Sequence, residues 1–144
     1  MKRILVLCTG NSARSQIAQA YLQHFGVDQV EVYSAGIEPK GVKPIAIQVL
    51  AEDGIDIAHH TSNHADEYLH IPFDFVITVC DKAREQCPFF PSAGELIHHS
   101  FPEPSHMEGR DKLTAFREVR DLIKAYSQEF IATRLSANNP ISTH

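Results

Sequence analysis

One short segment near the N-terminus combines a thiol, small polar residues and an arginine at a spacing that suits attack on an oxyanion. An apolar run over residues 4–7 leads to Cys8, and Arg14 follows after five residues. A cysteine is a good nucleophile only as its thiolate, and backbone N–H groups, a helix N-terminus and an arginine all favour that form. The same groups bind a tetrahedral anion. The segment therefore predicts a loop that holds an oxyanion and presents the sulfur of Cys8 to its central atom.

Each residue type in this loop suits the curvature or the charge that the loop needs. Gly10 permits a positive φ without steric cost, and Asn11 tolerates the left-handed region better than most residues. Arg14 offers a planar pair of donors, and a hydroxyl from Ser12 or Ser15 would lower the pKa of the thiol. We expect the oxyanion to be bound by residues 9–14, here called the oxyanion loop: Thr9, Gly10, Asn11, Ser12, Ala13 and Arg14. The alternative is that the cysteine is a small buried residue at a strand end.

Strand-like and helix-like segments alternate along the chain. Apolar and β-branched runs predict strands over residues 3–7, 30–33, 73–79 and 95–101. Apolar residues at helical spacing predict helices over residues 14–26, 44–53 and 111–135, with a short helix or turn over 81–86. This order predicts an α/β fold, a single three-layer domain with a mostly parallel four-stranded sheet and helices on both faces. We expect residues 1–135 to form this domain and residues 136–144 to be a polar tail.

Two further cysteines, Cys80 and Cys87, suggest thiol chemistry beyond a single nucleophile. Cys8 and Cys80 each follow a predicted strand, and ligands in such sheets bind at the carboxyl ends of strands, so we expect both at one edge of the sheet. Positions seven apart in a helix lie about 10 Å apart along its axis, so a Cys80–Cys87 disulfide requires the segment between them to unwind. Three thiols at one edge can pass a disulfide from one to the next. Two inert thiols and two zinc ligands are the alternatives.

Composition narrows the class of protein. A length of 144 residues suits one domain, and a net charge of −5 argues against a nucleic-acid partner. No apolar run approaches 18 residues, so we expect no membrane span and a cytoplasmic location. We expect no cofactor and no metal. The adjacent pairs His59–His60 and His98–His99 fit a solvated surface better than a metal site, because neighbouring side chains point in different directions.

The chain resembles the thioredoxin-coupled arsenate reductases, which share their fold with the low-molecular-weight protein tyrosine phosphatases. The resemblance covers nearly the whole chain and rests on residues 8–16, 33–38, 54–57, 79–80, 87–88 and 101–104. It implies that Cys8 attacks arsenate and that Ser15 stabilises the thiolate of Cys8. It further implies that Cys80 attacks the Cys8–arsenic adduct and releases arsenite, and that Cys87 then forms a Cys80–Cys87 disulfide for thioredoxin to reduce.

The proton donor departs from the pattern of the family. The family normally has an aspartate before a proline, whereas this chain has Glu103 before Pro104. The resemblance therefore implies Glu103 as the general acid, with a side chain longer by one methylene, and Asp81 and Glu108 are the alternatives.

A potassium site found in some members is also altered. Its two acidic positions correspond to Gln19 and Asn63 here, whereas Asn11 and Ser34 are retained. We therefore expect no tight potassium site, and we expect Asn11 and Ser34 to bond each other and support the loop.

The leading hypothesis is an arsenate reductase that draws its electrons from thioredoxin. The alternative is a low-molecular-weight protein tyrosine phosphatase that uses Cys8 and Arg14, and a third hypothesis is an oxyanion or redox sensor without catalysis. Phosphate and arsenate are nearly equal in size and charge, so the oxyanion loop alone does not separate the first two. The phosphatases usually lack the Cys80 and Cys87 pair, which favours the reductase.

Overall fold

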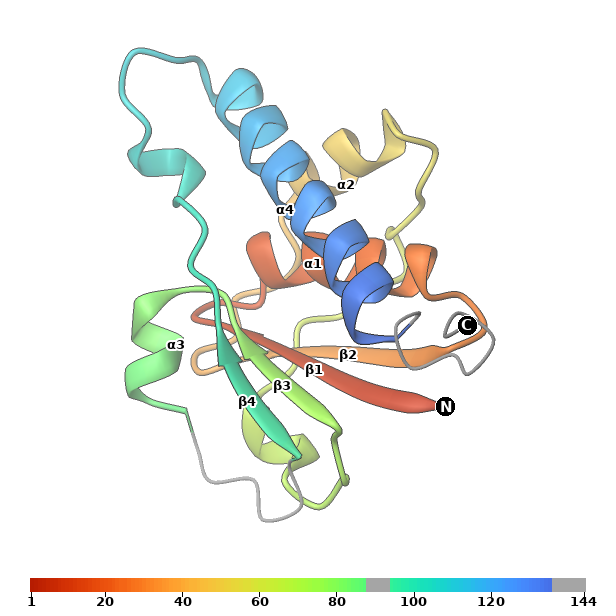
Figure 1. Ribbon diagram of the computed structural model, residues 1–144. Helices are drawn as coiled ribbons and strands as arrows, with labels where there is room; N and C mark the ends of the chain where they lie inside the picture. Colours follow the sequence, from red (N-terminus) through yellow and green to blue (C-terminus); the bar gives the residue numbers. More distant parts are fainter. Residues whose placement is uncertain (88–93, 136–144) are drawn as a thin grey trace.

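The computed structural model describes residues 1–87 and 94–135, which contain one parallel sheet (Figure 1). Its strands are β1 (Lys2–Cys8), β2 (Val30–Gly36), β3 (Phe75–Thr78) and β4 (Glu95–His98). They lie in the order β2-β1-β3-β4, and every adjacent pair is parallel. The central strand β1 is buried from Ile4 to Cys8, because both faces of the sheet are covered.

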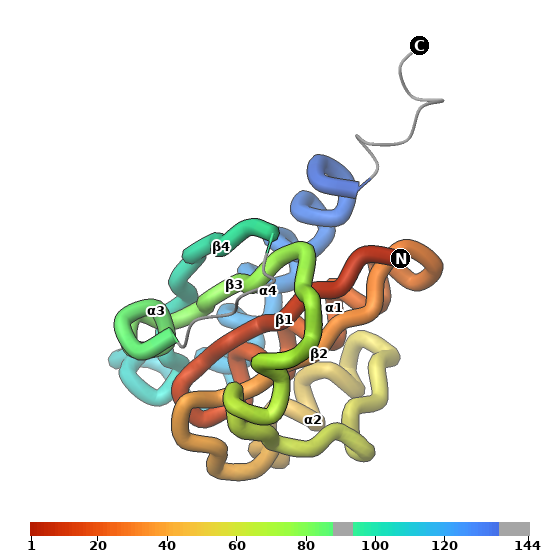
Figure 2. The backbone as a smooth tube through the Cα atoms, turned by 90° about the horizontal axis from the view of Figure 1, so that it is seen from below, coloured from red at the N-terminus to blue at the C-terminus, as the bar shows by residue number. Residues whose placement is uncertain are grey.

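Helices cover the sheet on both sides. One layer contains α1 (Arg14–Phe25), α2 (Pro44–Ala51) and the long helix α4 (Lys112–Arg134), as Figure 1 shows. The other side, seen in Figure 2, carries α3 (Asp81–Glu85) and the segment with the 3₁₀ helix η1 (Ala65–Tyr68); a second 3₁₀ helix, η2 (Pro104–His106), precedes α4. The α/β three-layer fold expected from the sequence is confirmed. None of the described helices is long and apolar enough to cross a membrane.

Local signals explain where the main helices begin and end. Asp111 precedes α4, and its carboxylate accepts a hydrogen bond from the N–H of Thr114 at 2.8 Å. Pro44 is the first residue of α2, and Gly54 follows that helix with a φ of 76°. The loop with Pro88 and Pro91 and the tail from residue 136 lie outside the described residues.

The strands differ from expectation mainly at their carboxyl ends. β2 continues to Gly36, because its pairing with β1 runs through to Cys8. β4 ends at His98, three residues early, although the N–H groups of His99 and Phe101 still donate to Thr78 and Val79 at 2.9 and 3.0 Å. These bonds hold the following segment against the carboxyl end of β3. Figures 1 and 2 both show α3 at this same end of the sheet.

Candidate active site

The backbone of the oxyanion loop turns its carbonyl groups outward. Each carbonyl of residues 8–13 accepts a hydrogen bond, and the donors are the backbone N–H groups of Ile37, Glu38, Lys40, Lys43 and Ile17 and the side-chain amide of Gln16. Within the described residues, no backbone N–H of residues 10–14 has a protein acceptor. Since a peptide N–H points away from the adjoining carbonyl, these N–H groups face the centre of the loop, as in an anion-binding nest.

Asn11 holds the loop in its curved form. Its φ is 48°, so of the two loop residues whose types suit the left-handed region, Asn11 adopts it and Gly10 does not. The buried amide of Asn11 donates to Ser15 Oγ at 2.8 Å and Ser34 Oγ at 3.0 Å. Its Oδ1 accepts from the N–H of Asn63 at 2.9 Å. These three bonds fix a conformation that asparagine tolerates on its own only moderately well.

Ser34 and Gln19 extend this network with neutral groups. Ser34 Oγ donates to Gln19 Oε1 at 2.6 Å, and Gln19 Nε2 donates to the carbonyl of Val32 at 3.2 Å. The side-chain oxygens of Asn11, Gln19 and Ser34 therefore each accept a hydrogen bond from a protein donor. Within residues 1–87 and 94–135, no three His, Cys, Asp or Glu side chains gather as metal ligands would.

Ser15 lies at the start of α1 and is fully buried beneath the loop. Its Oγ accepts the hydrogen bond from Asn11, which leaves its own proton available as a donor. No hydrogen bond in the described part of the chain joins Ser15 Oγ to the sulfur of Cys8.

The role of Gln16 was not predicted, and the prediction of a solvated surface is wrong for two of the histidines. Gln16 is fully buried and donates to the carbonyls of Asn11 and Thr61 at 3.1 and 3.0 Å. His60 is half-buried against Gln16, with Nδ1 and Oε1 3.0 Å apart, and burial lowers the pKa of this histidine. His98 is likewise bonded, to Thr78 at 2.8 Å and Asp81 at 3.0 Å. The expected solvated surface therefore fits His59 and His99 but not their neighbours.

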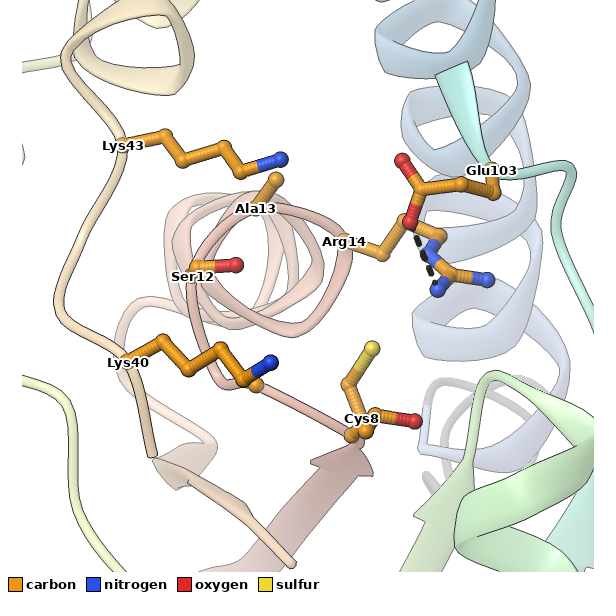
Figure 3. A pocket seen from close by; sticks show the side chains of 9 residues that line it. Cys8, Ser12, Ala13, Arg14, Lys40, Lys43 and Glu103 are labelled. Carbon is orange, nitrogen blue, oxygen red and sulfur yellow. Dashed lines mark hydrogen bonds and ion pairs between the residues drawn. The ribbon is translucent and has the colours of Figure 1, made fainter. Parts of the chain in front are cut away.

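A cavity of about 220 Å³ opens in front of the loop (Figure 3). It is lined by Cys8, Thr9, Gly10, Ser12, Ala13, Arg14, Lys40, Lys43 and Glu103. No aromatic side chain of the described residues lines it. The two lysines were not predicted to line the site. They follow the carboxyl end of β2, which neighbours β1, and this position in the sequence could have indicated that they lie near the loop.

Glu103 reaches Arg14 at the mouth of this cavity (Figure 3). Glu103 Oε2 lies 3.0 Å from Arg14 Nη2, while Arg14 Nη1 donates to the carbonyl of Phe101 at 3.1 Å. Burial alone would raise the pKa of Glu103, but the N–H of Ser105 and the guanidinium of Arg14 hold it below its usual value. Glu103 is therefore a carboxylate in this state.

Glu103 is also the only carboxyl group of the described residues that lines the cavity. The alternative acid Asp81 is directed toward His98 instead, at 3.0 Å, and Glu108 does not line the cavity.

The thiols of Cys8 and Cys80 meet beside the loop, although they are distant in the sequence. Both are buried, and they share a hydrogen bond. Thr9 Oγ1 lies 3.2 Å from Cys80 Sγ. Cys80 has the place expected for it, because β1 and β3 are adjacent and parallel, so their carboxyl ends meet at one edge.

The two thiols titrate as a pair. The hydrogen bond from Cys8 lowers the pKa of Cys80 to about 5 against the effect of burial, and Thr9 and Arg14 contribute to that lowering. The pKa of Cys8 is raised, first by the same hydrogen bond and then by burial. The pair therefore loses one proton easily and holds the second firmly, so one thiolate is present near neutral pH.

Cys87 lies just beyond α3, which separates it from Cys80. Cys80 is the residue before the helix, Gln86 ends it, and Cys8 and Cys80 are free thiols. Cys87 is half-buried, and burial raises its pKa. The helix Asp81–Glu85 has only five residues, so little regular structure separates the two thiols.

Comparisons with known proteins show which family the sequence is similar to. Residues 3–140 match the model of the low molecular weight phosphotyrosine protein phosphatase family. An arsenate reductase of Halalkalibacterium halodurans is 43% identical over 134 residues, which cover 92% of this chain and 96% of that protein.

Two solved structures have the same fold. An arsenate reductase in its phosphate-binding state has a TM-score of 0.80 at 30% identity and covers 92% of this chain and 98% of its own. A thioredoxin-dependent arsenate reductase of Corynebacterium glutamicum has a TM-score of 0.72 at 30% identity and covers 94% of this chain and 63% of its own.

Proposed function

Since the chain belongs to the low molecular weight phosphotyrosine protein phosphatase family, we propose that it is an arsenate reductase that converts arsenate to arsenite with thioredoxin as the electron donor. The observation that carries this proposal is the meeting of Cys8 and Cys80 beside the oxyanion loop. A phosphatase needs one thiol at this place, whereas a reductase without a cofactor needs two thiols to supply two electrons.

The first step forms a bond between sulfur and arsenic. Arsenate is held by the N–H groups of the loop and by Arg14, and the thiolate of Cys8 attacks the arsenic atom. One oxygen of arsenate leaves as water, and Glu103 supplies a proton to it. The sulfur of Cys8 is then bonded to pentavalent arsenic, and no electron has yet been transferred.

The second step carries the reduction. The thiolate of Cys80 attacks the sulfur of Cys8, and the sulfur–arsenic bond breaks with its electron pair remaining on arsenic. Arsenite leaves, and Cys8 and Cys80 are oxidised together to a disulfide. The hydrogen bond between the two thiols supports this step, because it places Cys80 next to the sulfur that it must attack.

The third step carries the disulfide away from the loop. The thiolate of Cys87 attacks Cys80 and releases Cys8 as a thiolate, ready for another arsenate. The segment Asp81–Glu85 must unwind for this step. The dithiol of thioredoxin then reduces the Cys80–Cys87 disulfide. These thiols must be kept reduced between turnovers, which fits a protein that works in the cytoplasm.

The phosphatase remains the alternative function. The loop suits phosphate as well as arsenate, but no aromatic residue of the described chain lines the cavity, so a phosphotyrosine ring would find no aromatic partner there.

A parallel assay of two activities tests the proposal. Arsenate-dependent oxidation of reduced thioredoxin measures the reductase, and hydrolysis of p-nitrophenyl phosphate measures phosphatase chemistry at the same loop. We expect Cys80→Ser to abolish the first and retain the second. Cys8→Ser should abolish both. Arsenate reduction that survives in Cys80→Ser would refute the proposed thiol relay, and wild-type protein that hydrolyses the ester but never oxidises thioredoxin would favour the phosphatase.

A further inference from the structure

Lys40 and Lys43 belong to a segment that is fixed directly on the oxyanion loop. The N–H of Lys40 donates to the carbonyl of Gly10, and the N–H of Lys43 donates to the carbonyl of Ser12, each at 2.9 Å. The stem of Lys40 lies over Gly10, where a Cβ would come within 3.7 Å of it. The backbone of both lysines is therefore held in place by the same bonds that shape the loop.

Both ammonium groups point toward the cavity (Figure 3). Lys43 is half-buried, with Nζ 5.8 Å from the centre of the Phe116 ring, whereas Lys40 is exposed. Neither lysine forms an ion pair within residues 1–87 and 94–135. Lys2, Lys82 and Lys124, in contrast, each lie within 4 Å of a carboxylate. The two lysines at the cavity are thus available to an anionic ligand.

The charges in the cavity show why such cations are needed. Before an anion binds, the charge of Arg14 is balanced by Glu103 at 3.0 Å, so Arg14 does not add to the positive charge that attracts the anion. An arsenate dianion that enters beside a thiolate adds negative charge to negative charge, and in a sheltered cavity this repulsion is large. Lys40 and Lys43 supply the positive charge that offsets the incoming dianion, in a chain whose overall charge of −5 repels anions at long range.

The position of the lysines also bears on what the cavity accepts. A tetrahedral anion that places three oxygens against the loop must direct its fourth oxygen toward the mouth. In an aryl phosphate this fourth oxygen carries a ring, and the described lining offers that ring no aromatic side chain and places two ammonium groups beside it. In an inorganic oxyanion the fourth oxygen is a hydroxyl or a charged oxygen, which accepts hydrogen bonds from lysine.

We propose that Lys40 and Lys43 bind the outward-facing oxygen of the substrate and select inorganic oxyanions over phosphate esters. This inference rests on the proposed use of the loop for arsenate and assigns its preference to residues outside the loop. The two lysines are binding residues, and the thiol relay does not depend on them for electron transfer.

Calorimetric titration with inorganic phosphate and with phenyl phosphate tests this inference without turnover. We expect wild-type protein to bind phosphate more tightly than phenyl phosphate. Lys40→Met and Lys43→Met should each weaken phosphate binding about fivefold or more, since a hydrogen bond to a charged group is lost. Both variants should leave phenyl phosphate binding unchanged or tighter, so that the preference shrinks or reverses. Lys2→Met changes the net charge equally at a residue that does not line the cavity, and it should change neither value.

Each result has a distinct meaning. Equal weakening of both ligands in Lys40→Met and Lys43→Met would show a general charge effect and overturn the proposed selectivity. Unchanged phosphate binding in both variants would overturn the proposed contact. Either outcome leaves the thiol relay standing, because the relay is tested by thioredoxin oxidation. Rising salt should weaken phosphate binding more steeply in wild type than in the double variant, and identical salt slopes would count against the inference.

Discussion

Arg14 and Glu103 form an ion pair of 3.0 Å across the mouth of the oxyanion cavity, although 89 positions separate them in the sequence. The guanidinium that suits an oxyanion is therefore bonded to a carboxylate in the structure. An entering oxyanion competes with Glu103 for Arg14. Once Arg14 turns to the oxyanion, Glu103 loses its cation and gains an anionic neighbour, and both changes raise its pKa. We therefore expect binding of the substrate to convert this carboxylate into the proton donor that the first step requires.

This exchange predicts opposite effects of Glu103→Gln on binding and on turnover. Phosphate should bind several-fold more tightly, because the neutral amide competes less well for Arg14. Arsenate reduction should slow by about 10²–10⁴, the usual contribution of a general acid. Calorimetry with phosphate and single-turnover release of arsenite measure the two effects. Phosphate affinity that stays at the wild-type value would show that the ion pair does not compete with the ligand.

A shorter acid serves as the matched control. Glu103→Asp keeps a carboxyl group but shortens its reach toward Arg14 by one methylene. We expect tighter phosphate binding together with a smaller loss of turnover than in Glu103→Gln. If both variants lose turnover equally, the carboxyl group has no special role as acid.

The paired thiols predict a change in the reactivity of Cys8. The hydrogen bond and the negative charge of Cys80 both raise the pKa of Cys8. Cys80→Ser puts a neutral hydroxyl in place of that thiolate, while Arg14 still lowers the pKa of Cys8. The pKa of Cys8 should therefore fall. The pH profile of iodoacetamide alkylation at Cys8, read by mass spectrometry, should shift to lower pH. A shift to higher pH would mean that Cys80 stabilises the thiolate of Cys8 instead.

Because the hydrogen-bond network around Asn11 contains only neutral groups, we expect potassium not to stabilise the protein selectively. Ser34 bonds Gln19 at 2.6 Å and accepts from Asn11 at 3.0 Å, so the polar atoms there already have partners. Melting curves in sodium and potassium salts of equal ionic strength should coincide. Selective stabilisation by potassium would show that a cation displaces these hydrogen bonds.

Gly36 predicts a defect that affects the loop rather than the whole fold. A Cβ at this position would lie 2.8 Å from the carbonyl oxygen of Thr9 and 2.9 Å from the N–H of Asn11. Gly36→Ala should therefore displace the loop and weaken phosphate binding at least tenfold. Gly54→Ala is the control, because Gly54 has a φ of 76° with open space around it, so it should lower the melting temperature and leave phosphate binding intact. Equal phosphate affinity in the two variants would contradict the close approach of β2 to the loop.

Short-range signals explain which features the sequence alone predicts. The run from Ile4 to Arg14 encodes a buried strand, a tight loop and a helix start within a few residues, so periodicity and residue type suffice. The placement of Cys80 near Cys8 also follows from simple rules, because it needs only the parallel order of β1 and β3.

Several contacts that depend on how the loops pack were not predicted. The bond between Asn11 and Ser34 was expected, but the bond from the N–H of Asn63, far along the chain, was not. The pairing of Glu103 with Arg14 and the docking of Lys40 on Gly10 likewise depend on how loops pack against the sheet edge. The spacing of residues in the sequence does not predict such contacts. Which charged side chains line the cavity is therefore known only from the structure.

Mass spectrometry of trapped disulfides tests the relay most directly. Reduced protein is treated with one equivalent of arsenate, quenched by alkylation and digested. We predict a Cys80–Cys87 disulfide in wild type and a Cys8–Cys80 disulfide in Cys87→Ser, each accompanied by one equivalent of arsenite. Arsenite released without any disulfide that involves Cys80, or fully alkylated cysteines after exposure to arsenate, would contradict the account.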